Sequence, residues 1–240
     1  FEIKATLSSA YTAVNELHSA LRVLKSTNVG TTLWNQVMQY WAKLSVFESA
    51  SDTEKAFETV NSALTILKKI DAPIAFANML QTQVSLQLKI GEPLTEEMTA
   101  SLHTAETLLR EHNHLLGIAA VLDTKARAYA VSGLKDKVEE VIEESLNYVS
   151  NEQPGARATL LVSAAQTLVL ISENEKARAM LLEARALLEN QKASRAEAQA
   201  WTQMAELYEE LGDSVAALAC YKAATELVGL RSTSVGVVAK

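Results

Sequence analysis

The sequence predicts an all-α fold in which about eleven helices form stacked antiparallel pairs. Three observations predict it. Turn-forming residues are scarce, with only 8 Gly and 3 Pro among 240 residues, whereas a β-sandwich needs turn signals every ~8–12 residues. Apolar residues recur at steps of three and four, the period of an amphipathic helix. A pattern of small and apolar residues also recurs five times at nearly constant spacing.

Helix boundaries follow from breakers and caps. The three prolines, Pro73, Pro93 and Pro154, fall between apolar-periodic stretches, where proline is tolerated at or before a helix start. Ser51 and Glu54 have the spacing of a capping box, and Thr95 precedes two first-turn acids. The expected helices span residues 2–26, 31–49, 53–70, 73–90, 95–112, 115–132, 134–150, 155–172, 174–190, 194–211 and 214–228. We expect residues 230–240 to form a flexible tail.

The repeat lies in the second helix of each pair. A small or apolar residue is followed by an apolar residue four positions later and a small one three positions after that. The five sets are Ala56-Val60-Ala63, Met98-Leu102-Ala105, Val138-Ile142-Ser145, Ala177-Leu181-Ala184 and Ala217-Tyr221-Ala224. Their first members are 42, 40, 39 and 40 residues apart. Since antiparallel helices approach closely only where side chains are small, these sets predict the contacts between helices.

The last unit carries the clearest family resemblance. It reads Trp201-Thr-Gln-Met204-Ala205-Glu-Leu-Tyr208, then Leu211-Gly212-Asp213, then Ala217, Tyr221 and Ala224. This order of Trp, Tyr, Gly-Asp turn, Ala, aromatic and Ala resembles the tetratricopeptide repeat. Ala205 stands where the family usually has Gly, and the family's closing proline is missing near Gly229. The resemblance is strong over the final ~120 residues and weaker before them.

The resemblance implies a right-handed α-solenoid. We expect a single superhelical domain over residues 1–229, made of about five helix pairs and a leading helix. The repeat is about 40 residues long, against about 34 in the standard form. Such long repeats are similar to those of bacterial helix-turn-helix transcription regulators and of scaffold subunits in eukaryotic assemblies.

Charge and hydropathy exclude several classes. The net charge is −7 and the 22 Lys and Arg are scattered, so we expect no direct nucleic-acid contact by this segment. A run of 18 apolar residues is absent, which argues against a membrane span. The single cysteine, Cys220, cannot form an intramolecular disulfide. We expect a cytoplasmic protein, or a nuclear one if the source is eukaryotic.

The sequence carries few candidates for chemistry. Phosphate-binding glycine loops, HExxH and CxxC are absent. His112 and His114 could share a metal only with further ligands, and we interpret them as a polar helix end. An acidic patch at residues 139–144 is interpreted as a solvated helix face, and Cys220 as a packed small residue. We therefore predict a protein that is not an enzyme, with no catalytic residues, no metal and no cofactor.

A solenoid usually binds its partner on the concave face, which the first helix of each pair lines in this family. Carrying over the family's register gives these candidate partner-binding residues: Trp41, Ser45, Asn78, Gln81, Asp123, Arg127, Gln166, Gln199, Thr202 and Glu206, with Glu48, Ser85, Thr159 and Glu209 beside them. Tyr40 and Trp41 cannot both point inward, so one of them should face a groove. The amide-rich lining favours a protein or an extended peptide as partner, with self-association as an alternative. Because the slots lack paired lysines and asparagines, capture of a chaperone tail is not expected.

Three functions remain open from the sequence. The chain could be the sensing or oligomerisation part of a larger transcription regulator, a scaffold subunit of a cell-division or chromatin complex, or an accessory array of a multidomain enzyme. Because the chain starts at Phe1 rather than Met, we expect a fragment or a processed protein. The residues before Phe1 would discriminate among the three.

Overall fold

The structure is a computed structural model. It describes residues 17–25, 32–189 and 195–237, with side chains in the last helix described as far as Leu227. These residues form eleven α-helices and no strand. The chain divides into two compact units, 1–124 and 125–240, and the division falls within one helix. The expectation of a single domain over residues 1–229 stays a prediction.

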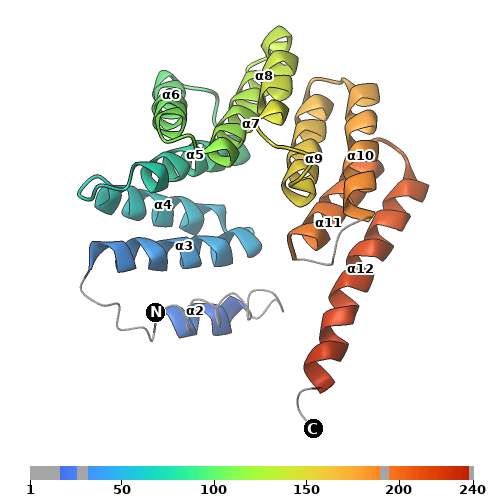
Figure 1. The fold of residues 1–240 in the computed structure, drawn as a ribbon, viewed down its shortest axis with the longest axis horizontal. Coiled ribbons are helices and arrows are strands. Elements are labelled where there is room, and N and C mark those ends of the chain that lie inside the picture. The colour runs from blue at the N-terminus through green and yellow to red at the C-terminus, as the bar shows by residue number, and fades with distance from the viewer. Residues whose placement is uncertain (1–16, 26–31, 190–194, 238–240) are drawn as a thin grey trace. The chain divides into compact units, whose positions relative to one another are not determined.

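Unit 1 is built from consecutive helices that pack in chain order. They are α2 (Leu17–Lys25), α3 (Leu33–Ser49), α4 (Thr53–Leu67), α5 (Pro73–Ile90), α6 (Glu96–Glu111) and the first part of α7 (Leu115–Val131). Figure 1 shows α2, α3 and α4 side by side, and α2 packs against α3, α3 against α4, α4 against α5 and α5 against α6. Gln39 of α3 donates a 3.0 Å hydrogen bond to the Leu24 carbonyl of α2. From α3 to α5, each helix thus contacts its predecessor and its successor, as in a helical repeat.

Unit 2 repeats this arrangement. It contains the end of α7, α8 (Lys135–Asn147), α9 (Pro154–Leu170), α10 (Asn174–Glu189), α11 (Arg195–Glu210) and α12 (Ser214–Val237). Helix α9 packs against α8, α10 and α11, and α11 packs against α12. The contact between α9 and α11 joins the first helices of two consecutive pairs. One hydrophobic core of this unit runs from Ala126 to Ala224.

The predicted repeat positions are the contacts between helices. Ala56, Val60 and Ala63 have no exposed surface, and the same holds for Ala177, Leu181 and Ala184. The sets that begin at Met98 and Val138 are buried to the same degree, with at most 2% exposed. Only Tyr221 is half-buried among the fifteen positions. The spacing of about forty residues is therefore the spacing of the packing contacts.

Three details of the helix ends were tested by the structure. Thr95 caps α6 as predicted, because its hydroxyl accepts from Met98 N at 3.1 Å. The capping box at Ser51 is wrong, because the cap of α4 is Asp52, whose carboxylate accepts from Lys55 N at 3.2 Å. Ser51 instead lies in the left-handed region with φ 55°, which ends the preceding turn. The predicted end of the last helix near residue 228 is also wrong, since α12 continues to Val237. The flexibility of residues 230–240 stays a prediction.

Gly117 lies in the first turn of α7, where this helix approaches α6. A Cβ at this position would lie 2.7 Å from Leu109 Cδ2 of α6 and 2.5 Å from His114 Nδ1. Glycine therefore lets the start of α7 approach the end of α6.

Candidate functional site

The candidate residues of α3 form one strip along the helix. Trp41 is half-buried, and Ser45 and Glu48 are exposed. The strip extends further toward the start of α3, because Trp34 is 46% exposed and Met38 is 38% exposed. Positions 34, 38, 41 and 45 are four, three and four residues apart, so they lie on one face. Trp34 and Met38 were not among the predicted partner-binding residues, because apolar residues at helical spacing are more often buried.

The candidates of α5 are polar and half-buried. Asn78, Gln81 and Ser85 occupy one face of the helix. The Gln81 amide donates a 2.7 Å hydrogen bond to the hydroxyl of Thr124 on α7, so the first helices of two consecutive pairs are linked here. Packing around the Glu48 carboxyl raises its pKa although the residue as a whole is exposed, and the nearby Lys89 of α5 opposes that rise. The C-terminal ends of α3 and α5 are therefore electrostatically coupled.

In unit 2, two of the candidate residues are hydrogen-bonded to each other. The Arg127 guanidinium on α7 donates a hydrogen bond to the side-chain oxygen of Gln166 on α9. Both residues were predicted to line the same surface, and this bond brings them together. Thr159 lies on the exposed face of α9 with Gln166. Asp123 is half-buried in unit 1, at the position one helical turn before Arg127.

The candidates of α11 are more acidic. Gln199, Glu206 and Glu209 are exposed and Thr202 is half-buried. The Glu209 carboxylate accepts a 3.2 Å hydrogen bond from the Tyr221 hydroxyl, so it is directed toward α12. The Thr202 hydroxyl donates to the Ala198 carbonyl of its own helix at 3.0 Å. Gln199 and Glu206 are therefore the exposed α11 candidates that, within the described part of the chain, no hydrogen bond directs toward α12.

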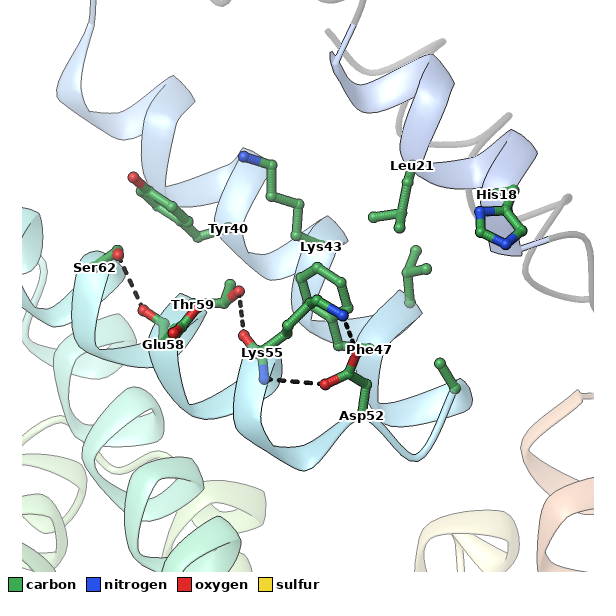
Figure 2. Close-up of a pocket in the computed structure, with 12 residues that line it drawn as sticks. His18, Leu21, Tyr40, Lys43, Phe47, Asp52, Lys55, Glu58, Thr59 and Ser62 are labelled. Atoms are coloured by element: carbon green, nitrogen blue, oxygen red, sulfur yellow. Dashed lines mark hydrogen bonds and ion pairs between the residues drawn. The ribbon is translucent and has the colours of Figure 1, made fainter.

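Tyr40 and Trp41 lie on different sides of α3. Tyr40 lines a cavity of about 460 Å³ bounded by α2, α3 and α4, whereas Trp41 does not. Figure 2 shows His18 and Leu21 of α2 on one side of this cavity and Lys55 of α4 on the other. Lys43 Nζ lies 5.3 Å from the centroid of the Tyr40 ring. This cavity could not be predicted from the sequence, because three separate helices enclose it.

The residues considered for metal binding or catalysis take part in helix ends, in the core or in surface ion pairs. His112 Nδ1 lies 2.9 Å from the Leu108 carbonyl at the end of α6, and Gly117 N donates to His114 Nδ1 at 3.0 Å. Within the described residues, no group of three or more His, Cys, Asp or Glu could hold a metal ion. Cys220 is fully buried, and burial raises the pKa of its thiol. In the acidic patch, Glu140 and Glu143 are exposed and Glu139 pairs with Lys176.

Among the described helices, none combines the length and the apolar character that a membrane span requires.

Helix pairs that nest through small residues every forty positions define a tetratricopeptide-type repeat fold, and known structures agree. No protein-family model matches the sequence, and no curated protein matches it. Among solved structures, the chain is similar to NprR in complex with its cognate peptide NprX, with 9% identity and a TM-score of 0.63 over 94% of this chain and 66% of NprR. It is also similar to the STAND protein PH0952 from Pyrococcus horikoshii, which has a tetratricopeptide repeat sensor, with 17% identity and a TM-score of 0.60.

That match covers 98% of this chain but only 37% of the STAND protein. A third similar structure is BtubC (BKLC) from P. vanneervenii, with 14% identity and a TM-score of 0.54 over 96% of this chain and 92% of that one. At these identities the likeness establishes the fold. The chain therefore has a tetratricopeptide-type helical repeat fold.

Proposed function

We propose that the chain is a non-catalytic protein- or peptide-binding module, and that it serves as the sensing part of a larger regulator, such as a transcription regulator in the cytoplasm. The partner lies along the exposed strips of the first helices. In unit 1 these strips belong to α3 and α5, and in unit 2 to α9 and α11. Solenoid repeats use such surfaces because successive helices present their side chains to one extended ligand.

The observation that carries the proposal is a pair of side-chain links between consecutive first helices. Gln81 donates to Thr124 in unit 1, and Arg127 donates to Gln166 in unit 2. Residues on consecutive first helices are thus within reach of one ligand inside each unit. Amide and guanidinium groups held in this way can exchange their mutual hydrogen bonds for bonds to a peptide backbone.

The strip of α3 supplies a different kind of contact. Trp34 and Met38 are large apolar residues with substantial exposed area, and Trp41 continues the strip. Tryptophan is enriched among residues that dominate binding energy, and methionine adapts to varied partners. We propose that these three side chains contact apolar side chains of the partner. Two similar folds support a sensing role, since one was crystallised with its cognate peptide and the other contains a repeat sensor.

A peptide-display selection against the full chain tests the proposal. Enriched peptides are then measured against the wild type, Trp41→Ala and Arg127→Glu by isothermal titration calorimetry. We expect each variant to weaken at least one selected peptide by about tenfold or more, the loss typical of an interface hot spot.

Lys222→Glu on α12 is the matched control, because Lys222 is 76% exposed and changes charge in the same way. It should leave binding unchanged. If every selected peptide binds Trp41→Ala and Arg127→Glu as tightly as the wild type, the first-helix strips are not the binding surface.

Self-association is a second candidate mode with an observation of its own. On α12, Val215 is 83% exposed and Leu218 is 71% exposed, on the same side of the helix. In the oligomerisation variant of the proposal, this face contacts a second copy. Sedimentation velocity of the wild type and of Leu218→Glu tests this mode. The variant becomes monomeric only if this face of α12 carries the contact between copies.

A further inference from the structure

Two grooves in the molecule occupy equivalent places in the repeat. Residues of α2, α3 and α4 correspond to residues of α8, α9 and α10 that lie 121 positions later in the sequence. Lys55, for example, corresponds to Lys176. Each groove lies between two second helices and is floored by the first helix between them. The volume is about 460 Å³ in unit 1 and about 260 Å³ in unit 2. The equivalent lining pairs are His18 with Glu139, Leu21 with Ile142, Phe47 with Leu168, and Lys55 with Lys176.

In unit 2 a carboxylate spans the groove. Glu139 Oε1 of α8 lies 2.5 Å from Lys176 Nζ of α10. Lys176 Nζ also lies 3.5 Å from Glu173 Oε2, three positions earlier and directly before α10 begins. The hydrogen bond to Glu139 is the leading cause of the raised pKa of Lys176. A lysine at this position thus binds a carboxylate that enters from the neighbouring second helix.

In unit 1 the position of that carboxylate is taken by an imidazole. His18 stands in place of Glu139, and it cannot form an ion pair with Lys55. Lys55 instead pairs at 2.5 Å with Asp52, the equivalent of Glu173. Figure 2 shows this pair on α4, with His18 across the cavity on α2. The groove in unit 1 is therefore larger than the groove in unit 2. Its lysine keeps the ion pair with the carboxylate three positions earlier but lacks the ion pair across the groove.

The remaining lining suits a flat apolar group. Leu21, Val46, Phe47 and the Tyr40 ring form apolar walls, and Lys43 Nζ lies over the Tyr40 ring. Two carboxylates line the α4 side: Asp52, which pairs with Lys55, and Glu58, the equivalent of Ala179. The charge of Glu58 disfavours an anion beside it, so the favourable place for one is between His18 and Lys55. The volume lies within the range of small-molecule sites.

We propose that this cavity binds an aromatic carboxylate, with the ring against Phe47 and Tyr40 and the carboxylate in the place that Glu139 holds in unit 2. The carboxylate bonds to Lys55 and His18, and the ring replaces water on the apolar walls. A free aromatic acid and the C-terminal aromatic residue of a peptide share this chemistry. The site is separate from the first-helix strips and does not depend on the function proposed for them.

The test is a titration of the full chain with 2-naphthoate and with 2-naphthamide, which has the same ring without the charge. Isothermal titration calorimetry should give binding of 2-naphthoate at least about tenfold tighter than that of 2-naphthamide, because a hydrogen bond between charged groups is lost. His18→Glu rebuilds the groove-spanning pair of unit 2 and should weaken 2-naphthoate about tenfold or more. Lys55→Gln should do the same.

Lys176→Gln is the matched control, because Lys176 is the equivalent of Lys55 in the groove of unit 2. It should leave 2-naphthoate binding unchanged. All three changed residues have exposed side chains, and circular dichroism checks that each variant folds. A peptide ending in Phe, with a free or an amidated C-terminus, identifies the source. Tighter binding of the free-carboxylate peptide than of 2-naphthoate assigns the site to a peptide end, and weaker binding assigns it to a free acid.

Three results would overturn the proposal: no binding of 2-naphthoate at millimolar concentration, equal binding of acid and amide, or binding that His18→Glu leaves intact.

Discussion

The segments α2–α4 and α8–α10 have the same packing and different surfaces. Ala56, Val60 and Ala63 have the same burial as their equivalents Ala177, Leu181 and Ala184. The exposed positions differ in kind, because Trp34 and Met38 of α3 correspond to Gly155 and Thr159 of α9. The groove positions differ too, with His18 in one segment and Glu139 in the other. Repeat units thus share the residues that hold helices together, while the residues that face solvent are free to specialise.

Truncation of the central buried residue of each set should give the largest effect. Leu181→Ala is expected to lower the free energy of unfolding by about 2–5 kcal/mol, through lost transfer energy and the cavity left behind. Its equivalent Val60→Ala should cost less, because fewer carbon atoms are removed from the core. Urea unfolding followed by circular dichroism measures both. Equal costs would show that the two packing sites are not matched in the way their burial indicates.

Enlargement of the small residues should give the next largest effect. Ala56→Leu, Ala177→Leu and Ala217→Leu are each expected to cost about 1–3 kcal/mol, since overpacking forces neighbouring side chains out of their rotamers. The measurement is the thermal unfolding midpoint. Ala100→Leu on the exposed face of α6 is the control and should change stability little. Unaltered unfolding in all three buried variants would contradict the assignment of these alanines to helix contacts.

The smallest expected effect concerns one hydroxyl in unit 2. Tyr208 takes the repeat position that Phe47 and Leu168 hold elsewhere, and neither of those side chains has a polar atom. Among the described residues, Tyr208 Oη is the one buried side-chain nitrogen or oxygen atom without a hydrogen-bond partner. Burial also raises the pKa of this phenol.

Because an unsatisfied buried hydroxyl costs free energy, Tyr208→Phe should raise the free energy of unfolding by about 1 kcal/mol. Chemical unfolding of the variant measures the gain. Tyr221→Phe is the comparison, since the Tyr221 hydroxyl does donate, to Glu209. A loss of stability in Tyr208→Phe would mean that the hydroxyl has a partner in solution.

Much of the fold could be predicted from the sequence. Helix starts at Pro73 and Pro154 and the cap at Thr95 follow from local chemistry, because each depends on a few adjacent residues. The failures also have local causes. Asp52 offers a carboxylate that both caps α4 and pairs with Lys55, so it takes the place expected for Ser51. The extension of α12 to Val237 passes Gly229, which the sequence marked as a helix end.

The candidate site was predicted in part. Register carried over from the family placed Gln81, Arg127 and Gln166 among the candidates, and the structure adds that each of them is hydrogen-bonded to a neighbouring helix. It did not identify Trp34 or Met38, because apolar residues at helical spacing are more often buried, and exposure depends on what packs against them.

The sequence by itself determined the repeat, since the size of a side chain at a packing position limits how closely two helices approach. Only the tertiary structure decided what lies between the helices. The cavity beside Tyr40 needs His18 from α2 and Lys55 from α4, and the closed groove in unit 2 needs Glu139 and Lys176. These residues are 37 positions apart in both cases. Whether such a pair closes a groove or leaves it open depends on which charges face each other once the helices have packed, and that cannot be read from either helix alone.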